Sequence, residues 1–173
     1  MELQMSPLAR AFCCLVVTTG VACAALSANS SAANRPVLGK VFTAKVIVVC
    51  AHALAQKRAE PPFPFSDFNP TKPDVSKLPA IGRYEAAGVR IFRTWLRSML
   101  ALGQPPQGRT AWAALINALR AHTRVIAHQQ AAALRRDAAA FTHDFYAGND
   151  VQRQTVRAAT AAGVPLCATA AGA

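Results

Sequence analysis

The sequence predicts an all-α protein, a four-helix up-down-up-down bundle with a long proline-rich loop after the first helix. Alanine, the residue with the highest helix propensity, is the commonest residue in the chain. Hydrophobic residues make up 53% of the 173 residues, which is enough for one domain to bury a core. Apolar residues also recur at helical spacing in four segments; proline- or glycine-rich stretches separate the first three, and Asp137 marks the start of the fourth.

The N-terminus predicts an export signal. An apolar run from Ala11 to Leu26 follows Arg10, and small residues suited to signal peptidase come next. We therefore expect residues 1–28 to be a signal peptide and the protein to be secreted or associated with the cell envelope. The stretch "GVAC" also fits a lipobox in which Cys23 is acylated, so a lipid-anchored protein is the alternative to a released one.

The remaining chain is expected to comprise a polar leader at residues 29–39 and a single helical bundle domain at residues 40–173. Once Cys13 and Cys14 have left with the signal peptide, and Cys23 has left or carries lipid, Cys50 and Cys167 remain. An even number of cysteines in an oxidising compartment predicts a Cys50–Cys167 disulfide. Two unrelated buried thiols are the alternative. A metal pair is disfavoured because neither cysteine lies in a CxxC pattern.

The first helix is expected within "GKVFTAKVIVVCAHALAQKRAE". Its predicted buried face comprises Phe42, Val46, Val49, Cys50 and Ala53. The β-branched run from Val46 to Val49 would suit a strand in isolation, but the alanine-rich turns that continue beyond it favour a helix.

A long connection follows in "PPFPFSDFNPTKPDVSKLP", whose six prolines exclude a helix or a central strand. We expect Phe63, Phe65 and Phe68 to pack onto the surface of the domain, with partner binding as the alternative.

The second helix is predicted to run from Pro79 to Gly103. Its seam residues follow a 3-4-3-4 spacing and are Ile81, Tyr84, Gly88, Ile91, Trp95, Ser98 and Leu102. Phe92, Leu96 and Met99 widen this face.

The third helix is predicted from Arg109 to Arg136. Asp137 is expected to cap a fourth helix that ends at Gly163, with Pro165 enforcing the stop. The "GND" stretch at 148–150 is expected to kink or interrupt that helix. In such a bundle, the end of the fourth helix lies beside the part of the first helix that carries Cys50.

Sequence motifs for catalysis are absent. There is no HExxH, GxSxG or Gly-rich phosphate loop, and the acidic residues are scattered singly. His122 and His128 are six residues apart and point to different faces of a helix, whereas metal-binding pairs need a spacing of three or four. We therefore expect no enzyme, no catalytic residue, no metal site and no cofactor.

Arginines form the one chemical pattern that remains. Arg83, Arg90 and Arg97 recur every seven residues and therefore line one stripe of a helix, which Arg120 and Arg124 could extend. The chain has a net charge of +11, which attracts anions. The stripe is therefore a candidate site for an anionic envelope polymer or a membrane surface. A solvated face and a compositional bias are the alternatives. Nucleic acid is not expected, because the protein is exported and the stripe lacks interleaved aromatic residues.

Four segments together resemble a loose group of uncharacterised exported or lipoprotein-like helical proteins of actinobacteria: "VCAHA", "TWLRSMLALGQPP", "AHTRVIAHQQAAALRRDAAAF" and "AAGVPLCA". The resemblance implies an extracytoplasmic helical bundle in which Cys50 and Cys167 are the paired positions. It implies no substrate.

The sequence thus favours an exported, non-enzymatic bundle that serves as an envelope-associated binding or structural module. The alternative is a ligand- or metal-binding sensor with a pocket inside the bundle that uses His122 or His128. A polar cavity lined by converging histidines or arginines would favour the alternative, and a filled apolar core would favour the first interpretation.

Overall fold

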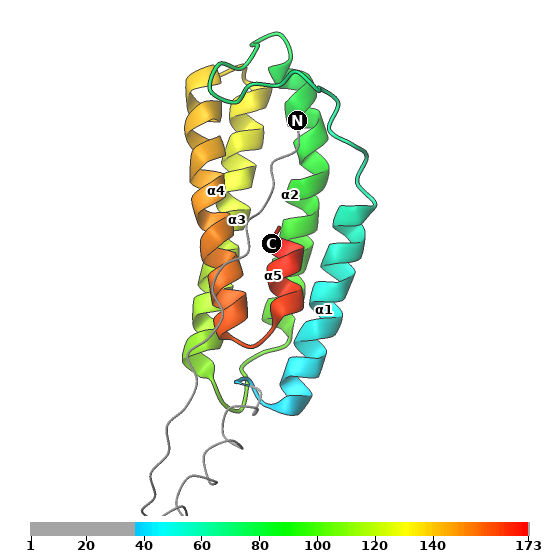
Figure 1. The fold of residues 1–173 in the computed structure, drawn as a ribbon, viewed down its shortest axis with the longest axis vertical. Helices are drawn as coiled ribbons and strands as arrows, with labels where there is room; N and C mark the ends of the chain where they lie inside the picture. The colour runs from blue at the N-terminus through cyan, green and yellow to red at the C-terminus, as the bar shows by residue number, and fades with distance from the viewer. Residues whose placement is uncertain (1–36, 173) are drawn as a thin grey trace, which may run out of the picture. The chain divides into compact units, whose positions relative to one another are not determined.

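A computed structural model of the chain describes residues 37 to 172 and contains five helices and no strand in that range. The helices are α1 (Lys40–Arg58), α2 (Leu78–Ala101), α3 (Arg109–Leu134), α4 (Ala138–Ala161) and α5 (Pro165–Ala171). Each runs antiparallel to the helix before it (Figure 1). The all-α prediction is confirmed, and the β-branched run in α1 is helical.

The predicted number of helices was wrong, because a fifth helix follows the predicted stop. Pro165 is the first residue of α5 rather than only the end of α4. Proline suits this position because its ring presets a helical φ angle and its missing N–H would have no partner there. Gly163, with a φ of 73°, provides the turn between the two helices.

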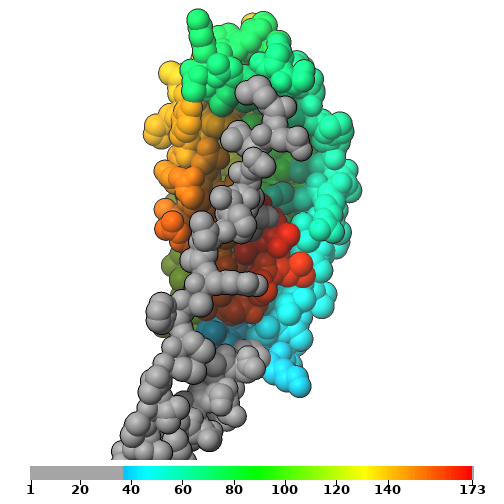
Figure 2. Space-filling view, in the orientation of Figure 1, coloured from blue at the N-terminus to red at the C-terminus, as the bar shows by residue number. Residues whose placement is uncertain are grey.

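Helix α5 lies between α4 and α1 (Figures 1 and 2). The four-helix topology predicted that α4 packs beside α1 as an antiparallel neighbour; instead, α5 lies between them. Helix α1 instead packs against α2 and α5, and it runs parallel to α5 (Figure 1). Because α5 has seven residues against 24 in α4, it fills only part of the space along the bundle.

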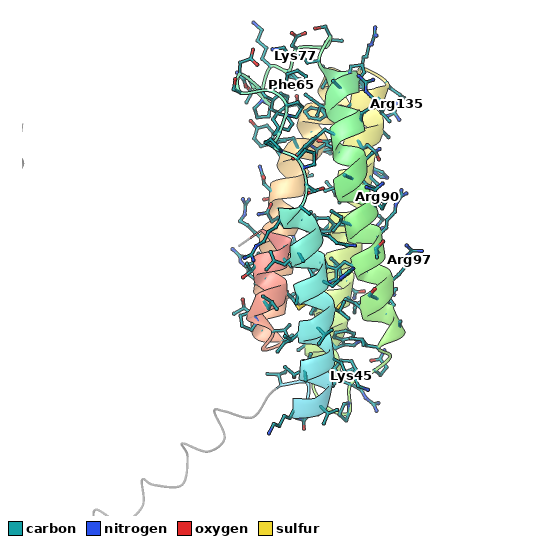
Figure 3. The ribbon with its side chains drawn as sticks, turned by 90° about the vertical axis from the view of Figure 1, so that its right-hand side faces the viewer. Lys45, Phe65, Lys77, Arg90, Arg97 and Arg135 are labelled. Atoms are coloured by element: carbon teal, nitrogen blue, oxygen red, sulfur yellow. A yellow bond between two sulfur atoms is a disulfide. The ribbon has the colours of Figure 1, made fainter. Side chains whose placement is uncertain are left out.

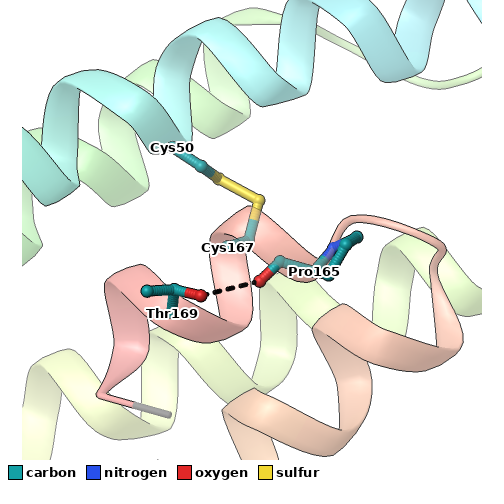
Figure 4. The surroundings of a disulfide bond; sticks show 4 residues. All are labelled: Cys50, Pro165, Cys167 and Thr169. Carbon is teal, nitrogen blue, oxygen red and sulfur yellow. Dashed lines mark hydrogen bonds between the residues drawn. A yellow bond between two sulfur atoms is a disulfide. The ribbon is translucent and has the colours of Figure 1, made fainter.

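The predicted disulfide is confirmed. Cys50 in α1 and Cys167 in α5 are bonded, their Cα atoms are 5.0 Å apart, and both residues are fully buried (Figure 4). The bond joins the first and last helices and stabilises their packing.

Around the disulfide lies the larger apolar core. Phe42, Val46 and Ala53 are buried on the predicted face of α1, and Val49 is half-buried. The Phe42 ring meets the Trp112 ring edge to face, with their centroids 5.0 Å apart. Of the predicted α2 seam, Ile81, Ile91 and Trp95 are buried, whereas Tyr84, Gly88, Ser98 and Leu102 are half-buried.

A smaller apolar cluster lies where the proline-rich loop meets the helices. It comprises Leu78, Ile81, Ala132, Ala133 and Phe141. As predicted, the loop aromatics pack onto this surface: the Phe68 ring lies 5.8 Å from Phe141, and the Phe63 ring lies 5.3 Å from Tyr84. The Phe65 side chain lies at this end of the bundle, beside Lys77 (Figure 3).

The fourth helix begins as predicted. Asp137 caps α4 by accepting a hydrogen bond from the backbone N–H of Ala140, with a donor–acceptor distance of 3.0 Å. The helix then continues through residues 148–150, so the "GND" stretch does not interrupt it.

The signal peptide at residues 1–28, Cys23 and most of the polar leader lie outside the described residues. Within residues 37–172, no helix combines the length and the apolar character that crossing a membrane requires.

Candidate functional site

Helix α2 carries a row of exposed arginines on its outer side, which we call the arginine face: Arg83, Arg90, Arg93 and Arg97. Figure 3 shows Arg90 and Arg97 projecting from the same side of α2, with Arg135, the residue after α3, further along that side. Residues seven apart on a helix lie on one stripe about 10 Å apart, which explains the alignment.

Three of these arginines border one hollow in the surface. Arg90, Arg93 and Arg97 line it together with Ala86, Val89 and Gln130, and its volume is about 380 Å³. Of the residues predicted for the stripe, Arg83 lies outside this hollow. Arg120 lines a different hollow, and Arg124 lines neither.

The positive charges of the arginine face are not neutralised by ion pairs within the described residues. Among residues 37–172, none of its four members forms an ion pair, and Arg97 donates only to the Thr94 hydroxyl, at 3.3 Å. Glu60 is close enough for Arg90 to influence its ionisation. The guanidinium groups are therefore available to an anion, to which they can donate paired hydrogen bonds.

A second feature, which the sequence did not predict, is a cavity of about 140 Å³ where the end of α1 meets α2 and α3. We call it the glutamate pocket. It is lined by Glu60, Tyr84, Glu85, Gly88, Val89, Phe92, Ile126 and Gln129.

Glu85 is the chemically distinctive residue of the pocket. Its Oε1 atom accepts a hydrogen bond from Gln129 Nε2 at 2.8 Å, while its Oε2 atom is buried without a hydrogen-bond partner in the described residues. Burial raises the pKa of Glu85 to about 7, although the Gln129 hydrogen bond opposes the rise.

Two further charged groups lie near the pocket, Glu60 in its lining and Lys57 over the Phe92 ring. Lys57 Nζ donates to the carbonyl oxygen of Ala170 at 3.2 Å and lies 5.5 Å from the centroid of the Phe92 ring. Burial lowers the pKa of Lys57, and the nearby Glu60 charge partly offsets this. Burial raises the pKa of Glu60, against the charges of Lys57 and Arg90.

His122 also contacts Phe92. It is 4% exposed, and its ring centroid is 4.4 Å from that of Phe92. Burial, with a contribution from the Lys57 charge, lowers the pKa of His122 to about 4, so the ring is neutral at pH 7. Its Nδ1 atom lies 3.5 Å from the Thr155 hydroxyl.

The two histidines considered for a pocket are not brought together, because His122 is buried while His128 is exposed. His52 lines a separate, mostly apolar hollow with Trp95, and His143 is paired with Asp144. The described residues contain no group of three or more His, Cys, Asp or Glu side chains placed to hold a metal ion.

The glutamate pocket is mostly apolar and is lined by two carboxyl groups, not by the converging histidines or arginines that would favour a sensor. The end that holds the disulfide is a filled apolar core. Beside it, the Phe92 ring lines the glutamate pocket and also contacts His122, and Lys57 lies over the same ring. The arginine face and the glutamate pocket are both arrangements that can bind ligands.

No protein-family model, curated protein or solved structure matches this chain. The comparisons thus name no family for it. Of the resemblance described above, the structure supports a helical protein with paired early and C-terminal cysteines.

Proposed function

We propose that this chain is an exported, non-enzymatic binding module of the cell envelope, and that the arginine face of α2 binds a linear anionic polymer. The observation that carries the proposal is the hollow of about 380 Å³ lined by Arg90, Arg93 and Arg97. Within the described residues, none of these guanidinium groups forms an ion pair, although Arg90 lies near Glu60.

A phosphate- or carboxylate-bearing polymer suits this face better than a membrane does. Membrane-surface helices place large apolar side chains beside their basic residues. Between Arg83 and Arg97 no large hydrophobic side chain is exposed, and Leu100, seven residues after Arg93, is the one exposed large hydrophobic residue of α2. A narrow chain with regularly spaced negative charges can instead follow a row of arginines along one helix.

Export is supported by the Cys50–Cys167 bond, because disulfides persist mainly in oxidising compartments. The predicted signal peptide at 1–28 agrees with it, and acylation of Cys23 would hold the module at a membrane. A polymer of the envelope is then a more accessible partner than nucleic acid.

The test is binding of the folded, oxidised chain to inorganic polyphosphate at about 50 and 200 mM salt. We expect binding that weakens as salt rises. The triple variant R90Q/R93Q/R97Q should bind at least about tenfold more weakly, because charge-assisted hydrogen bonds to the polymer are lost.

The matched control is R58Q/R109Q/R157Q, which removes the same charge from exposed positions on other helices. It should bind almost as the wild type does. Equal weakening of both variants would show diffuse charge attraction without a site. Binding to anionic phosphatidylglycerol vesicles but not to polyphosphate would assign the face to a membrane instead.

The glutamate pocket supports a second candidate function, binding of a small molecule within the bundle, because it places an uncompensated carboxylate beside an apolar cavity. The class of that molecule is argued next.

A further inference from the structure

We propose that the glutamate pocket binds a small organic ammonium ion, with Glu85 as its carboxylate partner and Phe92 and Tyr84 as aromatic walls. This inference uses different charged residues from the arginine face and does not depend on polymer binding.

The pocket opens to solvent, and a ligand group of a few heavy atoms would fill it. Its volume is about 140 Å³, similar to the apolar cavity of about 150 Å³ that accommodates a benzene molecule. Val89, Phe92 and Ile126 provide apolar surface for a short carbon chain. The α2 side of the pocket has free space beside Gly88. A Cβ atom at this position would contact only Glu60 Oε1, at 3.5 Å.

The charge of the pocket favours a cation. Glu60 and Glu85 both line the cavity, and no ion pair in residues 37–172 involves either of them. Glu85 lacks a positively charged partner more completely than Glu60 does, because its only hydrogen-bond partner in those residues is the neutral amide of Gln129. A ligand ammonium group would supply the missing donor and the missing charge together.

The charged groups of the protein do not already fill this role. Around Glu85, the end of α1 contributes Lys57 and Glu60, α2 contributes Tyr84 and Arg90, and α3 contributes His122. Lys57 directs its ammonium group to the Ala170 carbonyl, and its charge acts on Glu60. His122 is neutral at pH 7, and Arg90 lines the hollow of the arginine face.

Aromatic rings complete the recognition of a cation. Phe92 already lies 5.5 Å from the Lys57 ammonium, a distance typical of a cation–π contact, and it also lines the pocket. Tyr84 lines the pocket as well, and its ring packs against Phe63 of the loop. Aromatic rings attract an ammonium group through the negative faces of their π-systems, and the Glu85 carboxylate would add an opposite charge.

Binding should depend on pH through Glu85. The carboxyl group has a pKa of about 7 in the empty pocket, so the fraction that is ionised rises as pH increases through 7. An alkylammonium ion stays charged over this range, and its affinity should therefore rise between pH 6 and pH 8.

The experiment is an NMR titration of the full, oxidised chain with n-butylammonium chloride, n-butanol and sodium butyrate, three probes of the same length. We expect n-butylammonium to shift the side-chain amide signals of Gln129 and the methyl signals of Ile126 in a saturable manner. Butanol should bind at least about tenfold more weakly, and butyrate should not bind.

Two variants locate the site. Glu85→Gln keeps the shape of the side chain and should reduce n-butylammonium affinity at least tenfold at pH 8, while abolishing its dependence on pH. Gly88→Leu should block the pocket, and its better helix propensity protects the fold. The control Asp150→Asn removes an exposed carboxylate of α4 and should leave binding unchanged.

The inference fails if n-butanol binds as tightly as n-butylammonium, since the pocket would then be only an apolar cavity. It also fails if Glu85→Gln binds n-butylammonium as the wild type does, or if n-butylammonium produces no saturable shifts in the folded wild type. None of these outcomes bears on polyphosphate binding at the arginine face.

Discussion

Glu85 occupies a position on α2 that faces the interior of the bundle, four residues after Ile81 and seven before Phe92. Apolar residues normally fill such positions, because burying a carboxylate without a cationic partner is unfavourable. Residues whose ionisation is shifted in this way are concentrated at functional sites. At the residue scale, the position of this single side chain distinguishes the pocket from an ordinary gap between helices.

Replacing Glu85 with Gln should change stability in a way that depends on pH. The pKa of Glu85 is about 7 in the folded chain against 4.5 for a free carboxyl group. As pH rises from 4.5 to 7, the unfolded chain therefore releases this proton before the folded chain does. The free energy of unfolding of the wild type falls by on the order of 3 kcal/mol over this range. The variant should match the wild type at pH 4 and be more stable by about that amount at pH 8, as measured by urea unfolding.

The wild type and the Glu85→Gln variant must be compared with each other at each pH, because His122 changes the stability of both with pH in the opposite direction. Its pKa is lowered to about 4, so its contribution to stability is lost as pH falls from 6.5 through 4. That loss occurs in both proteins and cancels in their difference. A stability difference that is equal at pH 4 and pH 8 would contradict the burial of an ionisable Glu85.

Sequence reasoning identified the arginine row but missed the glutamate pocket. The arginine row follows from a spacing within one helix, which can be read directly. The pocket joins Glu60, Glu85 and Gln129, which come from the end of α1, α2 and α3, so only packing brings them together. A sequence signal did exist: Glu85, His122 and Gln129 each lie at helical spacing from apolar core positions.

At the scale of elements, α2, α3 and the start of α4 could be predicted closely because their apolar periodicity, their glycine and proline boundaries and the Asp137 cap agree with one another. Helix α5 was missed because Pro165 can either end a helix or begin one. The alanine-rich segment after Pro165 favoured the second reading. This short helix also explains why Cys167 meets Cys50 although α4 itself does not pack against α1.

Two glycines of α2 provide a matched test of how α2 packs on α3. A Cβ atom at Gly82 would lie 2.8 Å from Leu134 Cγ and 3.1 Å from the Leu134 backbone nitrogen, so the helices would have to move apart. At Gly88 it would contact only Glu60 Oε1. We expect Gly82→Ala to lower the free energy of unfolding by about 1 kcal/mol, and Gly88→Ala to raise it by about 0.5–1 kcal/mol.

Thermal unfolding of both variants checks this prediction, and each serves as the control for the other. The gain in helix propensity is the same at both positions, so the difference between the variants reports the contact with Leu134. If Gly82→Ala stabilised the protein as much as Gly88→Ala does, the result would contradict the close contact between Gly82 of α2 and Leu134 of α3.

For the whole molecule, the Cys50–Cys167 bond closes a loop between residues separated by 117 positions. Chain entropy predicts a stabilisation on the order of 4–5 kcal/mol for a loop of this length. The double variant C50A/C167A should lose at least this amount in urea unfolding. The wild type measured in excess reductant should lose a similar amount, whereas a variant as stable as the oxidised wild type would argue against the bond.

The same bond determines how the bundle would carry a mechanical load. Tension applied between residue 37 and the C-terminus passes along the first part of α1 to Cys50, crosses the sulfur–sulfur bond to Cys167, and leaves through the end of α5. Helices α2, α3 and α4 lie within the covalent loop and outside this force path. A protein pulled in this way would extend only at its ends, and both the arginine face and the glutamate pocket would remain folded until the disulfide was reduced.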